Sequence, residues 1–398
     1  MLGKTNLTMI ESGATVTEIT DYSWNATEIG GVNGTFQKAI YENGVLVGIT
    51  KDGMIVYTED GENWAVKIIE LDNGDAVELN DVVWDGLRYI FTGNHTDNSS
   101  YTHGLLVFSD DLVNYDIRIN VDKEEYFDLS SGSVKFFGLI VKDGKYFIIT
   151  GYIQNGRFTC DSIMTDFETY AIKNRIRVMS ATQVNIATCD AKVSKSTSMC
   201  IIQMVCKSLS GCDYSMNTST DGRSFDERLL GNVTSPENFI YTFECKDYLY
   251  YYLDRSRDNY SLYKVINPSE SAVMATGIQF GFVDAAYFNK CEIFINSHAM
   301  IVINPGESIA DKTLDDFVEI TYDFSMTSIV KAFDRLYVFG TGGNVLVSSN
   351  EINNEEAFAV RTLSARKALY DANRYTDKKW AELDARITAI EAGQKLNE

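Results

Sequence analysis

Histidine is the side chain best suited to proton transfer and metal binding near neutral pH, and this sequence has three, His95, His103 and His298. The first two lie in the polar stretch Gly93–Gly104, which reads GNHTDNSSYTHG. A zinc site would need a cysteine or further carboxylates at ligand spacing, and no such pattern joins the two histidines. We therefore expect His95 and His103 to lie in a surface loop and to hold no metal.

Paired carboxylates are the second kind of chemistry open to this chain, because it contains 56 aspartate and glutamate residues. Glycoside hydrolysis uses two such groups, one as an acid and the other as a base or nucleophile. The two members of a pair can come from distant segments, so the sequence does not single one out. Glycosidase activity stays open as an alternative, without an assigned catalytic residue.

Polar and aromatic residues that could bind a ligand gather in two stretches, Gly93–Gly104 and Val121–Ser131. Their amides and hydroxyls can donate hydrogen bonds, and their rings can serve as platforms for a sugar or a protein side chain. The binding candidates are Asn94, His95, Tyr101, His103, Tyr126 and Phe127. The alternative is that both stretches are solvated loops without a ligand.

Calcium is a further possibility that the sequence does not support. No spaced calcium-binding motif joins the nearby carboxylates Asp72, Asp75, Asp122 and Glu124. We predict no metal and no cofactor.

Composition and charge exclude other classes of protein. The formal net charge of −21 repels nucleic-acid phosphates and anionic lipid surfaces. No stretch approaches the roughly 18 apolar residues of a membrane span, and residues 1–9 lack the apolar core of a secretory signal peptide. The seven cysteines are scattered without a C-x-x-C pair, which favours reduced, buried thiols. We expect a protein made in a cytoplasm, with no nucleic-acid partner and no membrane insertion.

The elements that would position these side chains follow an internal repeat. An apolar strand, a tight turn and a second strand rich in aromatic and β-branched residues recur along the chain. Six copies are Lys38–Thr50, Asp81–Gly93, Gly138–Gly151, Ile240–Leu253, Ala285–Asn296 and Ser328–Gly340. Their turns are predicted at Asn43-Gly44, Asp85-Gly86, Asp143-Gly144, Lys246-Asp247, Asn289-Lys290 and Asp334-Arg335. A seventh copy with a longer connection joins Val184–Cys189 to Met199–Cys206.

The second half of each unit is a third strand, a polar turn and an aromatic residue that opens a fourth strand. In the best copy, Thr58, Asp60, Gly61 and Trp64 stand at fixed offsets. The offsets recur, in part or in full, at Ser109, Asp111 and Tyr115, at Asp166 and Tyr170, and at Ser219, Asp221, Gly222 and Phe225. Four strands in each of seven units predict an all-β fold, a seven-bladed β-propeller over residues 33–363.

These offsets, S/T-x-D-G-x-x-W, resemble the Asp-box repeat of β-propellers such as sialidases and of many non-enzymatic proteins. The resemblance covers four of the seven units and implies architecture, with a structural role for Asp60, Asp111, Asp166 and Asp221 in their turns. A sialidase also needs an arginine cluster, and the first arginine here is Arg88. The early arginine motif of that family therefore has no match, no sialidase residue carries over, and we expect no enzyme.

The N-terminal segment, residues 1–32, contains a possible closing strand. Ser23–Ile29 echoes Asn63–Ile69, including the aromatic residue, and so resembles the outer strand of a blade. We expect it to pair with the last blade beside Phe358–Leu363, which would hide an exposed strand edge.

Residues 364–398 have a different character, with apolar residues at alternating three- and four-residue steps that indicate a coiled-coil-like helix. The predicted oligomerisation or anchoring residues are Trp380, Leu383, Ile387 and Ile390. The apolar seam is too short for a stable isolated coil. The helix therefore needs a partner, and the alternative is that it docks on its own propeller.

Residues 375–391 resemble the short coiled-coil segments of bacteriophage tail-fibre and baseplate proteins. The resemblance implies a non-enzymatic virion protein whose helix binds other virion proteins or itself. Its propeller would bind a bacterial surface glycan during host attachment or dock to a neighbouring subunit. The alternatives are an Asp-box glycoside hydrolase acting on a bacterial surface polysaccharide, and a purely structural virion joint.

Overall fold

The computed structural model describes the chain in segments, all within the first of two compact units, which span residues 1–350 and 351–398. The described residues are 5–9, 17–22, 24–119, 133–142, 145–154, 157–165, 172–181, 185–193, 200–208, 211–219, 226–233, 242–245, 248–254, 260–267, 270–278, 281–312, 318–319 and 325–348. The predicted helix at 364–398, with Trp380, Leu383, Ile387 and Ile390, lies outside them.

The described residues form seven four-stranded antiparallel sheets and a separate two-stranded sheet of β1 (Thr5–Met9) and β2 (Thr17–Tyr22). One short 3-10 helix, η2 (Ile309–Asp311), is also present. The first sheet comprises β4 (Phe36–Glu42), β5 (Val45–Thr50), β6 (Met54–Thr58) and β7 (Ala65–Ile68). The second comprises β8 (Ala76–Trp84), β9 (Tyr89–Thr96), β10 (Thr102–Ser109) and β11 (Asp116–Ile119). The third comprises β12 (Val134–Lys142), β13 (Lys145–Gln154), β14 (Arg157–Thr165) and β15 (Ile172–Ala181), and the fourth comprises β16 (Asn185–Val193), β17 (Cys200–Ser208), β18 (Gly211–Ser219) and β19 (Asp226–Val233). The fifth sheet comprises β20 (Thr242–Cys245), β21 (Tyr248–Asp254), β22 (Tyr260–Asn267) and β23 (Glu270–Ile278). The sixth comprises β24 (Asp284–Phe288), β25 (Cys291–Ile295), β26 (Ala299–Ile303) and β27 (Val318–Glu319). The seventh comprises β28 (Met326–Ala332), β29 (Arg335–Gly340), β30 (Asn344–Ser348) and β3 (Trp24–Glu28).

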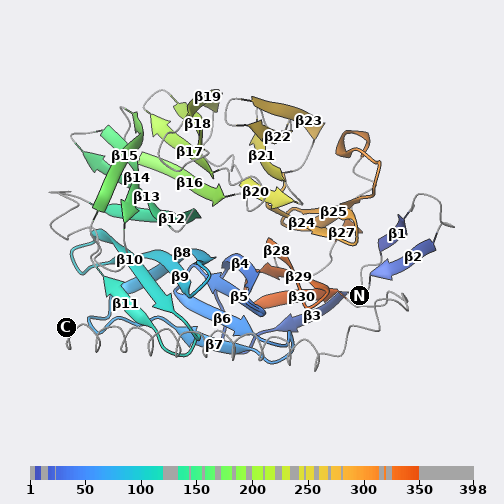
Figure 1. Ribbon diagram of the computed structural model, residues 1–398, viewed down its shortest axis with the longest axis horizontal. Coiled ribbons are helices and arrows are strands. Elements are labelled where there is room, and N and C mark those ends of the chain that lie inside the picture. The colour runs from blue at the N-terminus through green and yellow to red at the C-terminus, as the bar shows by residue number, and fades with distance from the viewer. Residues whose placement is uncertain are drawn as a thin grey trace, which may run out of the picture. The chain divides into compact units, whose positions relative to one another are not determined.

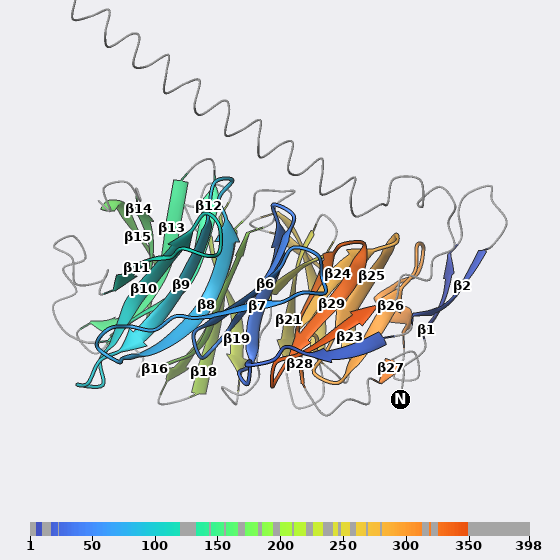
Figure 2. The same cartoon turned by 90° about the horizontal axis from the view of Figure 1, so that it is seen from below.

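The sheets follow one another in chain order and close into a ring. The first strand of each sheet contacts the first strand of the next, from β4 to β8 and onward to β28, and β28 contacts β4. Figure 1 shows β28 beside β4, and in the turned view of Figure 2 the sheets stand side by side. Each sheet therefore packs between two neighbours.

This packing explains the long apolar runs in the middle strands. Every residue of β5 is buried, because both faces of the strand meet another sheet. One apolar layer, for example, joins Val47 and Ile55 of the first sheet to Phe91 and Val107 of the second. The core is thus a series of layers between sheets, and no single sheet has a core of its own.

The hairpin turns correct two details of the sequence-based expectations. Asn43 and Gly44 have φ of 53° and 77°, as a type I′ turn requires. The last turn lies at Phe333 and Asp334, with φ of 46° and 58°, one residue before the predicted Asp334-Arg335. The ring of Phe333 packs against Tyr41 at a centroid distance of 4.9 Å, and this contact offsets the strain of a positive φ at a bulky residue.

The turn predicted at Asp85-Gly86 is longer than two residues, since β8 ends at Trp84 and β9 begins at Tyr89. The Asp85 Oδ1 atom accepts hydrogen bonds from the backbone N–H groups of Leu87 and Arg88, at 2.7 and 2.8 Å. The aspartate thus organises a wider turn.

The last sheet takes its fourth strand from the N-terminal segment. β3 pairs antiparallel with β30, from Trp24 opposite Ser348 to Glu28 opposite Asn344. Phe358–Leu363, the segment expected beside this strand, lies outside the described residues. Chain positions more than 300 residues apart are therefore joined in one sheet by backbone hydrogen bonds.

Candidate functional site

The turn between β6 and β7 is organised by Asp60. Its Oδ1 atom accepts hydrogen bonds from the backbone N–H groups of Glu62 and Asn63, at 2.8 and 2.7 Å, and its Oδ2 atom accepts one from the Asn63 side chain at 2.7 Å. The Thr58 hydroxyl donates to Asp60 at 3.0 Å and accepts from the Gly61 N–H at 2.9 Å. All of these bonds are local, so the carboxylate is committed to its own turn.

The same turn joins two sheets of the ring. Trp64 lies edge-on to Tyr337 and Phe339 of β29, with centroids 6.3 and 6.1 Å apart. The Tyr337 hydroxyl donates to the Gly61 carbonyl at 3.5 Å, and burial raises the pKa of Tyr337 to about 12, which keeps that donor protonated. Gly61 has a φ of 79°, and a Cβ atom there would lie 2.0 Å from the Tyr337 oxygen.

The turn between β10 and β11 repeats this arrangement around Asp111. Its Oδ1 atom accepts from the backbone N–H groups of Val113 and Asn114, at 2.9 and 2.8 Å, and its Oδ2 atom accepts from the Asn114 side chain at 2.9 Å. Leu112 takes the glycine position with a φ of 58°. The Tyr115 hydroxyl donates to the Leu112 carbonyl at 2.7 Å, and Lys67 of the neighbouring sheet lies over the Tyr115 ring.

One member of these turns was not predicted from the sequence. An asparagine precedes the aromatic residue in both copies, Asn63 before Trp64 and Asn114 before Tyr115, and it holds the second carboxylate oxygen. This asparagine could have been found from the sequence, because it stands at the same position before the aromatic residue in both copies. The remaining residues of the repeat lie outside the described residues or have an undescribed side chain; these are Asp166, Tyr170, Ser219, Asp221, Gly222 and Phe225.

Hydrogen bonding lowers the pKa of both turn carboxylates. Partial burial raises the pKa of Asp60, but the hydrogen bonds from Asn63, Glu62 and Thr58 outweigh it and bring the value to about 2. The bonds from Asn114 and Val113 bring the pKa of Asp111 to about 2 as well. A general acid near neutral pH needs the opposite shift, so both carboxylates are suited to holding turns.

His95 and His103 lie in strands, and the prediction of a surface loop is wrong for both. They stand opposite each other in β9 and β10, with ring centroids 5.4 Å apart and exposed fractions of 1% and 4%. Only Asp97–Tyr101 connects the two strands. The polar composition of Gly93–Gly104 concealed the strands because the partners of Asn94 and of His95 Nδ1 are distant in the sequence.

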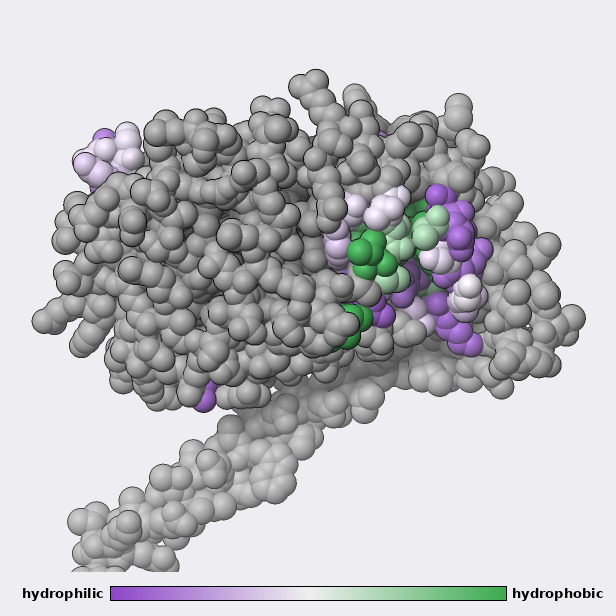
Figure 3. Space-filling view, turned by 90° about the horizontal axis from the view of Figure 1, so that it is seen from above, coloured by the Kyte–Doolittle hydropathy of each residue, from purple (hydrophilic) through white to green (hydrophobic). Residues whose placement is uncertain are grey.

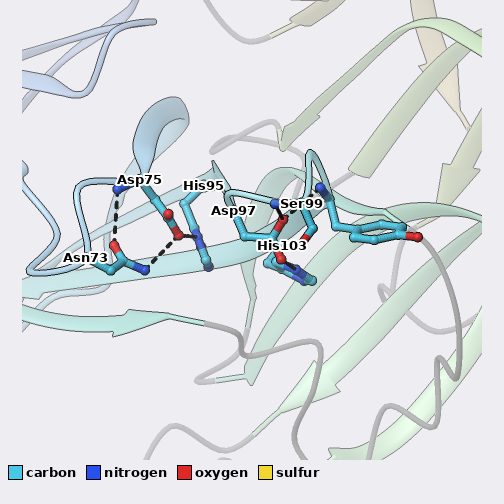
Figure 4. A network of polar contacts seen from close by, with 7 residues as sticks. Asn73, Asp75, His95, Asp97, Ser99 and His103 are labelled. Carbon is cyan, nitrogen blue, oxygen red and sulfur yellow. Dashed lines mark hydrogen bonds and ion pairs between the residues drawn. The ribbon is translucent and has the colours of Figure 1, made fainter.

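Each histidine contacts an aspartate from a different connection (Figure 4). The Nδ1 atom of His95 lies 2.9 Å from Oδ2 of Asp75, in the segment between β7 and β8. That carboxylate also accepts a hydrogen bond from the Asn73 side chain at 2.8 Å. The Nε2 atom of His103 lies 3.3 Å from Oδ2 of Asp97.

Asp97 also shapes the loop between β9 and β10. Its Oδ1 atom accepts from the backbone N–H groups of Ser99 and Tyr101, both at 2.9 Å, and the bond from Tyr101 is the main cause of its lowered pKa. Tyr101 itself is 50% exposed at the end of this loop. The other two aromatic candidates, Tyr126 and Phe127, lie outside the described residues.

Asn94 is not available as a ligand-binding loop residue, which corrects that prediction. It is buried in β9, where its Oδ1 atom accepts from the Phe136 N–H at 2.7 Å and its Nδ2 atom donates to the Phe136 carbonyl at 3.4 Å. Asn80 donates to the same carbonyl at 2.7 Å. These bonds fix β12 against the second sheet at a β-bulge near Phe136.

Two further buried carboxylates, which sequence analysis did not single out, link neighbouring sheets. Asp81 of β8 forms an ion pair with Lys38 of β4, and it accepts from the Leu139 N–H of β12 at 3.0 Å. Asp284 of β24 accepts from Ser328 Oγ and the Ile329 N–H of β28, both at 2.9 Å. A carboxylate in a first strand can thus satisfy the backbone of the next first strand.

The described residues contain no group of three or more histidine, cysteine, aspartate or glutamate side chains that could hold a metal ion. Cys245 and Cys291 are buried, and burial raises the pKa of the Cys291 thiol to about 11. No helix in the described part is long and apolar enough to cross a membrane.

Exposed apolar side chains are spread over three sheets of the described part. In Figure 3 the main coloured area contains apolar and hydrophilic groups side by side. The most exposed large apolar residues are Val66, Ile68, Leu87, Tyr101, Val113, Ile266 and Val273.

No protein-family model matches the sequence, and no curated protein matches it. Among solved structures, the chain is similar to YCF48 bound to D1 peptide, with 13% identity and a TM-score of 0.52 over 82% of this chain and 95% of that one. It also aligns with the WD40 domain of Neurospora crassa Pan2, with 10% identity and a TM-score of 0.47 over 82% and 96% of the two chains. A thermostable family-43 glycoside hydrolase aligns with 9% identity and a TM-score of 0.39 over 72% and 97%. The latter two scores are too low to support a conclusion.

The ring of four-stranded antiparallel sheets, together with the similarity to YCF48, defines a β-propeller fold. Propellers include both enzymes and binding proteins. The fold alone therefore does not assign an activity.

Proposed function

We propose that the chain is a seven-bladed β-propeller with a C-terminal helix, and that it recognises a partner without catalysing a reaction. Each of the seven sheets in the described residues has four strands, and β28 closes the ring against β4. These features support the blade number. The helix is proposed from the apolar spacing in residues 364–398.

One observation carries the non-enzymatic proposal: the acids and histidines best placed for chemistry are engaged within the protein. Asp60 and Asp111 hold turns, Asp81 and Asp284 bind the backbone of neighbouring sheets, and His95 is buried beside Asp75. Substitution of these groups is therefore expected to affect stability first. We therefore assign recognition of the partner to side chains that are exposed in the connections between strands.

We propose that the recognition face is formed by the segment between β7 and β8 together with the loop Asp97–Tyr101. Tyr101 is the exposed aromatic residue of this loop, and tyrosine can stack on a sugar ring or pack against a protein side chain. The partner is a bacterial surface glycan or a neighbouring virion protein. The solved YCF48 structure holds a peptide, which supports a protein segment as one kind of partner for a propeller.

The proposed setting is a bacteriophage tail, baseplate or fibre. It rests on the likeness of residues 375–391 to tail-protein helices, a part of the chain outside the described residues. In this setting the helix attaches the propeller to other virion proteins or to further copies of itself. A structural joint, without a receptor, is the other role within the same particle.

The test is binding of labelled protein to intact bacterial cells and to purified tail proteins. Tyr101→Ala should weaken cell binding by about tenfold, the usual loss for one exposed anchoring aromatic. Leu87→Ala is the control, because Leu87 is also exposed but lies at the opposite end of β9. Equal cell binding by wild type and Tyr101→Ala would contradict the proposed recognition face. Binding to tail proteins but not to cells would indicate that the protein is a structural joint of the virion.

A further inference from the structure

The loop Asp97–Tyr101 of the proposed recognition face uses most of its own backbone donors. The Asp97 N–H donates to the Tyr101 carbonyl, and the Ser100 N–H donates to the Asp97 carbonyl, both at 2.9 Å. The N–H groups of Ser99 and Tyr101 donate to the Asp97 Oδ1 atom, also at 2.9 Å. Four of the five N–H groups of the loop are therefore bonded within the loop itself.

This internal bonding limits how the loop can recognise a partner. A peptide that binds as an added strand needs N–H and C=O groups of the protein backbone for its own hydrogen bonds. In this loop the bonded N–H groups are already occupied, and the carbonyls of Asp97 and Tyr101 accept internal bonds as well. Recognition by the loop therefore comes from its side chains.

The exposed side chains of the loop carry no charge. Asn98, Ser99 and Ser100 are exposed, and Tyr101 is 50% exposed. The carboxylate oxygens of Asp97, the one charged residue of the loop, are directed to internal partners. An aromatic ring beside an amide and hydroxyl groups matches a sugar, whose C–H face can stack on the ring while its hydroxyl groups form hydrogen bonds.

Asp97 also holds Tyr101 in place before any partner binds. Its Oδ1 atom bonds the N–H groups on both sides of Ser100, which has a φ of 65°, unusual for a residue other than glycine. Its Oδ2 atom lies 3.3 Å from Nε2 of the buried His103. Figure 4 shows Asp97 in contact with both Ser99 and His103. A loop that is ordered in advance loses less conformational entropy on binding.

The charges around the loop disfavour an anionic partner. Glu70 and Asp72 are exposed in the segment between β7 and β8, and the chain as a whole has a formal net charge of −21. In the neighbouring turn between β5 and β6, Lys51 and Asp52 are both exposed and balance each other. A polysaccharide rich in carboxylates or phosphates would be repelled by this face, whereas a neutral polysaccharide would not.

We propose that the recognition face binds a neutral polysaccharide of the bacterial surface. The Tyr101 ring stacks on one sugar, the side chains of Asn98, Ser99 and Ser100 form hydrogen bonds with sugar hydroxyl groups, and Asp97 is the positioning residue that holds the ring. This choice of a neutral glycan over a protein segment rests on the proposed function, because both concern the same face.

The main test is binding of labelled full-length protein to intact bacterial cells treated with periodate or with protease. Periodate cleaves the vicinal diols of sugars, and it should lower binding by at least about tenfold, the loss expected for one anchoring aromatic residue alone. Protease treatment should leave binding unchanged. Soluble polysaccharide from the same cells, separated into neutral and anionic fractions, serves as competitor, and the neutral fraction should compete.

The outcomes separate the choice of partner from the proposed function. Binding that is lost after protease treatment but kept after periodate would show a protein partner and overturn the neutral glycan. An anionic fraction that competes as well as the neutral one would overturn it too. In both cases a recognition role survives. Binding neither to cells nor to purified tail proteins would overturn the recognition role as well.

Tyr101→Phe tests how the ring is used. It keeps the ring and removes only the hydroxyl group, so it should bind neutral polysaccharide nearly as well as wild type, in contrast to Tyr101→Ala. Binding by Tyr101→Phe that is as weak as that of Tyr101→Ala would contradict stacking. Thermal unfolding of each variant confirms that it is folded.

Asp97→Ala tests the positioning role. Removal of the acceptor for two loop N–H groups should weaken polysaccharide binding by about three- to tenfold, the cost of ordering one or two side chains on binding. Asp97→Asn keeps an acceptor oxygen and should restore most of the binding. In a Tyr101→Ala background Asp97→Ala should have no further effect, because the two residues act as a unit. An equal loss in both backgrounds would show that Asp97 does not act through Tyr101.

Discussion

Two turn carboxylates show how one residue can organise a connection and a contact between sheets together. Asp60 and Asp111 each accept two backbone N–H groups and an asparagine side chain. The aromatic residue that follows each turn then packs toward the preceding sheet. The offsets of these residues could be predicted from the sequence because every hydrogen bond of the two carboxylates is local.

Asp60 should make stability depend on pH in the acid range. Its folded pKa of about 2 lies below the ordinary 3.8, so its ionised form stabilises the protein above about pH 4, and this contribution is lost as pH falls toward 2. Asp60→Asn should lower the free energy of unfolding by about 1 kcal/mol at pH 7, and the difference from wild type should shrink as pH falls through about 2.

Denaturant unfolding at several pH values measures this effect, with Asp72→Asn as the control because Asp72 is exposed. A difference between wild type and Asp60→Asn that stays constant down to pH 2 would show that the carboxylate charge does not stabilise the turn.

Gly61 and Gly74 make a matched pair for testing the contact between the first and last sheets. Both have positive φ, 79° and 75°, but an added Cβ at Gly61 meets the Tyr337 hydroxyl whereas one at Gly74 meets nothing within 4 Å. Gly74→Ala should cost about 1 kcal/mol for the backbone alone, and Gly61→Ala about 1 to 3 kcal/mol more. Tyr337→Phe should recover part of the excess when combined with Gly61→Ala, as measured by thermal unfolding.

Strands made of consecutive apolar residues could be predicted from the sequence, whereas strands with many polar residues could not. The Asn43-Gly44 hairpin could be predicted because these two residues themselves favour the positive φ that the turn requires. The end of β9 could not be predicted in this way, because Asn94 pairs with Phe136 and His95 pairs with Asp75. Such partners are set by the packing of one sheet on the next, which hydrophobic periodicity does not record.

The buried acids between sheets follow the same reasoning. Asp81 and Asp284 are buried, and the local sequence gives no indication of the groups that satisfy their carboxylates. Their role depends on the backbone of a neighbouring first strand, Leu139 for one and Ile329 for the other. Sequence alone could therefore locate the strands but not these links.

β3 should be needed to close the ring. Deletion of residues 1–28 would expose the edge of β30 and remove the whole β3 ladder, so unfolding should begin at a lower temperature, by roughly 2 °C for each kcal/mol lost in a domain of this size. An exposed edge also promotes association. Deletion of residues 1–22 is the control, because it removes β1 and β2, which pair with each other, and keeps β3. Equal melting of the two truncated proteins would show that β3 does not contribute.

For the whole molecule, the ring contacts run from β4 to β28 within residues 24–348, so the propeller should fold without the C-terminal segment. Deletion of residues 364–398 should leave a cooperatively melting β-protein and abolish self-association or binding to tail proteins. Circular dichroism and light scattering on both chains measure this. Loss of folding in the shorter chain would indicate that the helix docks on its own propeller.

Recognition and catalysis are separated by incubating the full-length protein with bacterial cell-wall polysaccharides and measuring, in the same samples, bound glycan and newly formed reducing ends. A recognition propeller should bind its glycan, or bind none if its partner is a virion protein, and in either case should form no reducing ends above the rate without protein. Release of reducing ends at enzyme-like turnover, about 1 per second or faster, would contradict a non-enzymatic role for the protein. Such activity would show that a carboxylate pair in this propeller is catalytic.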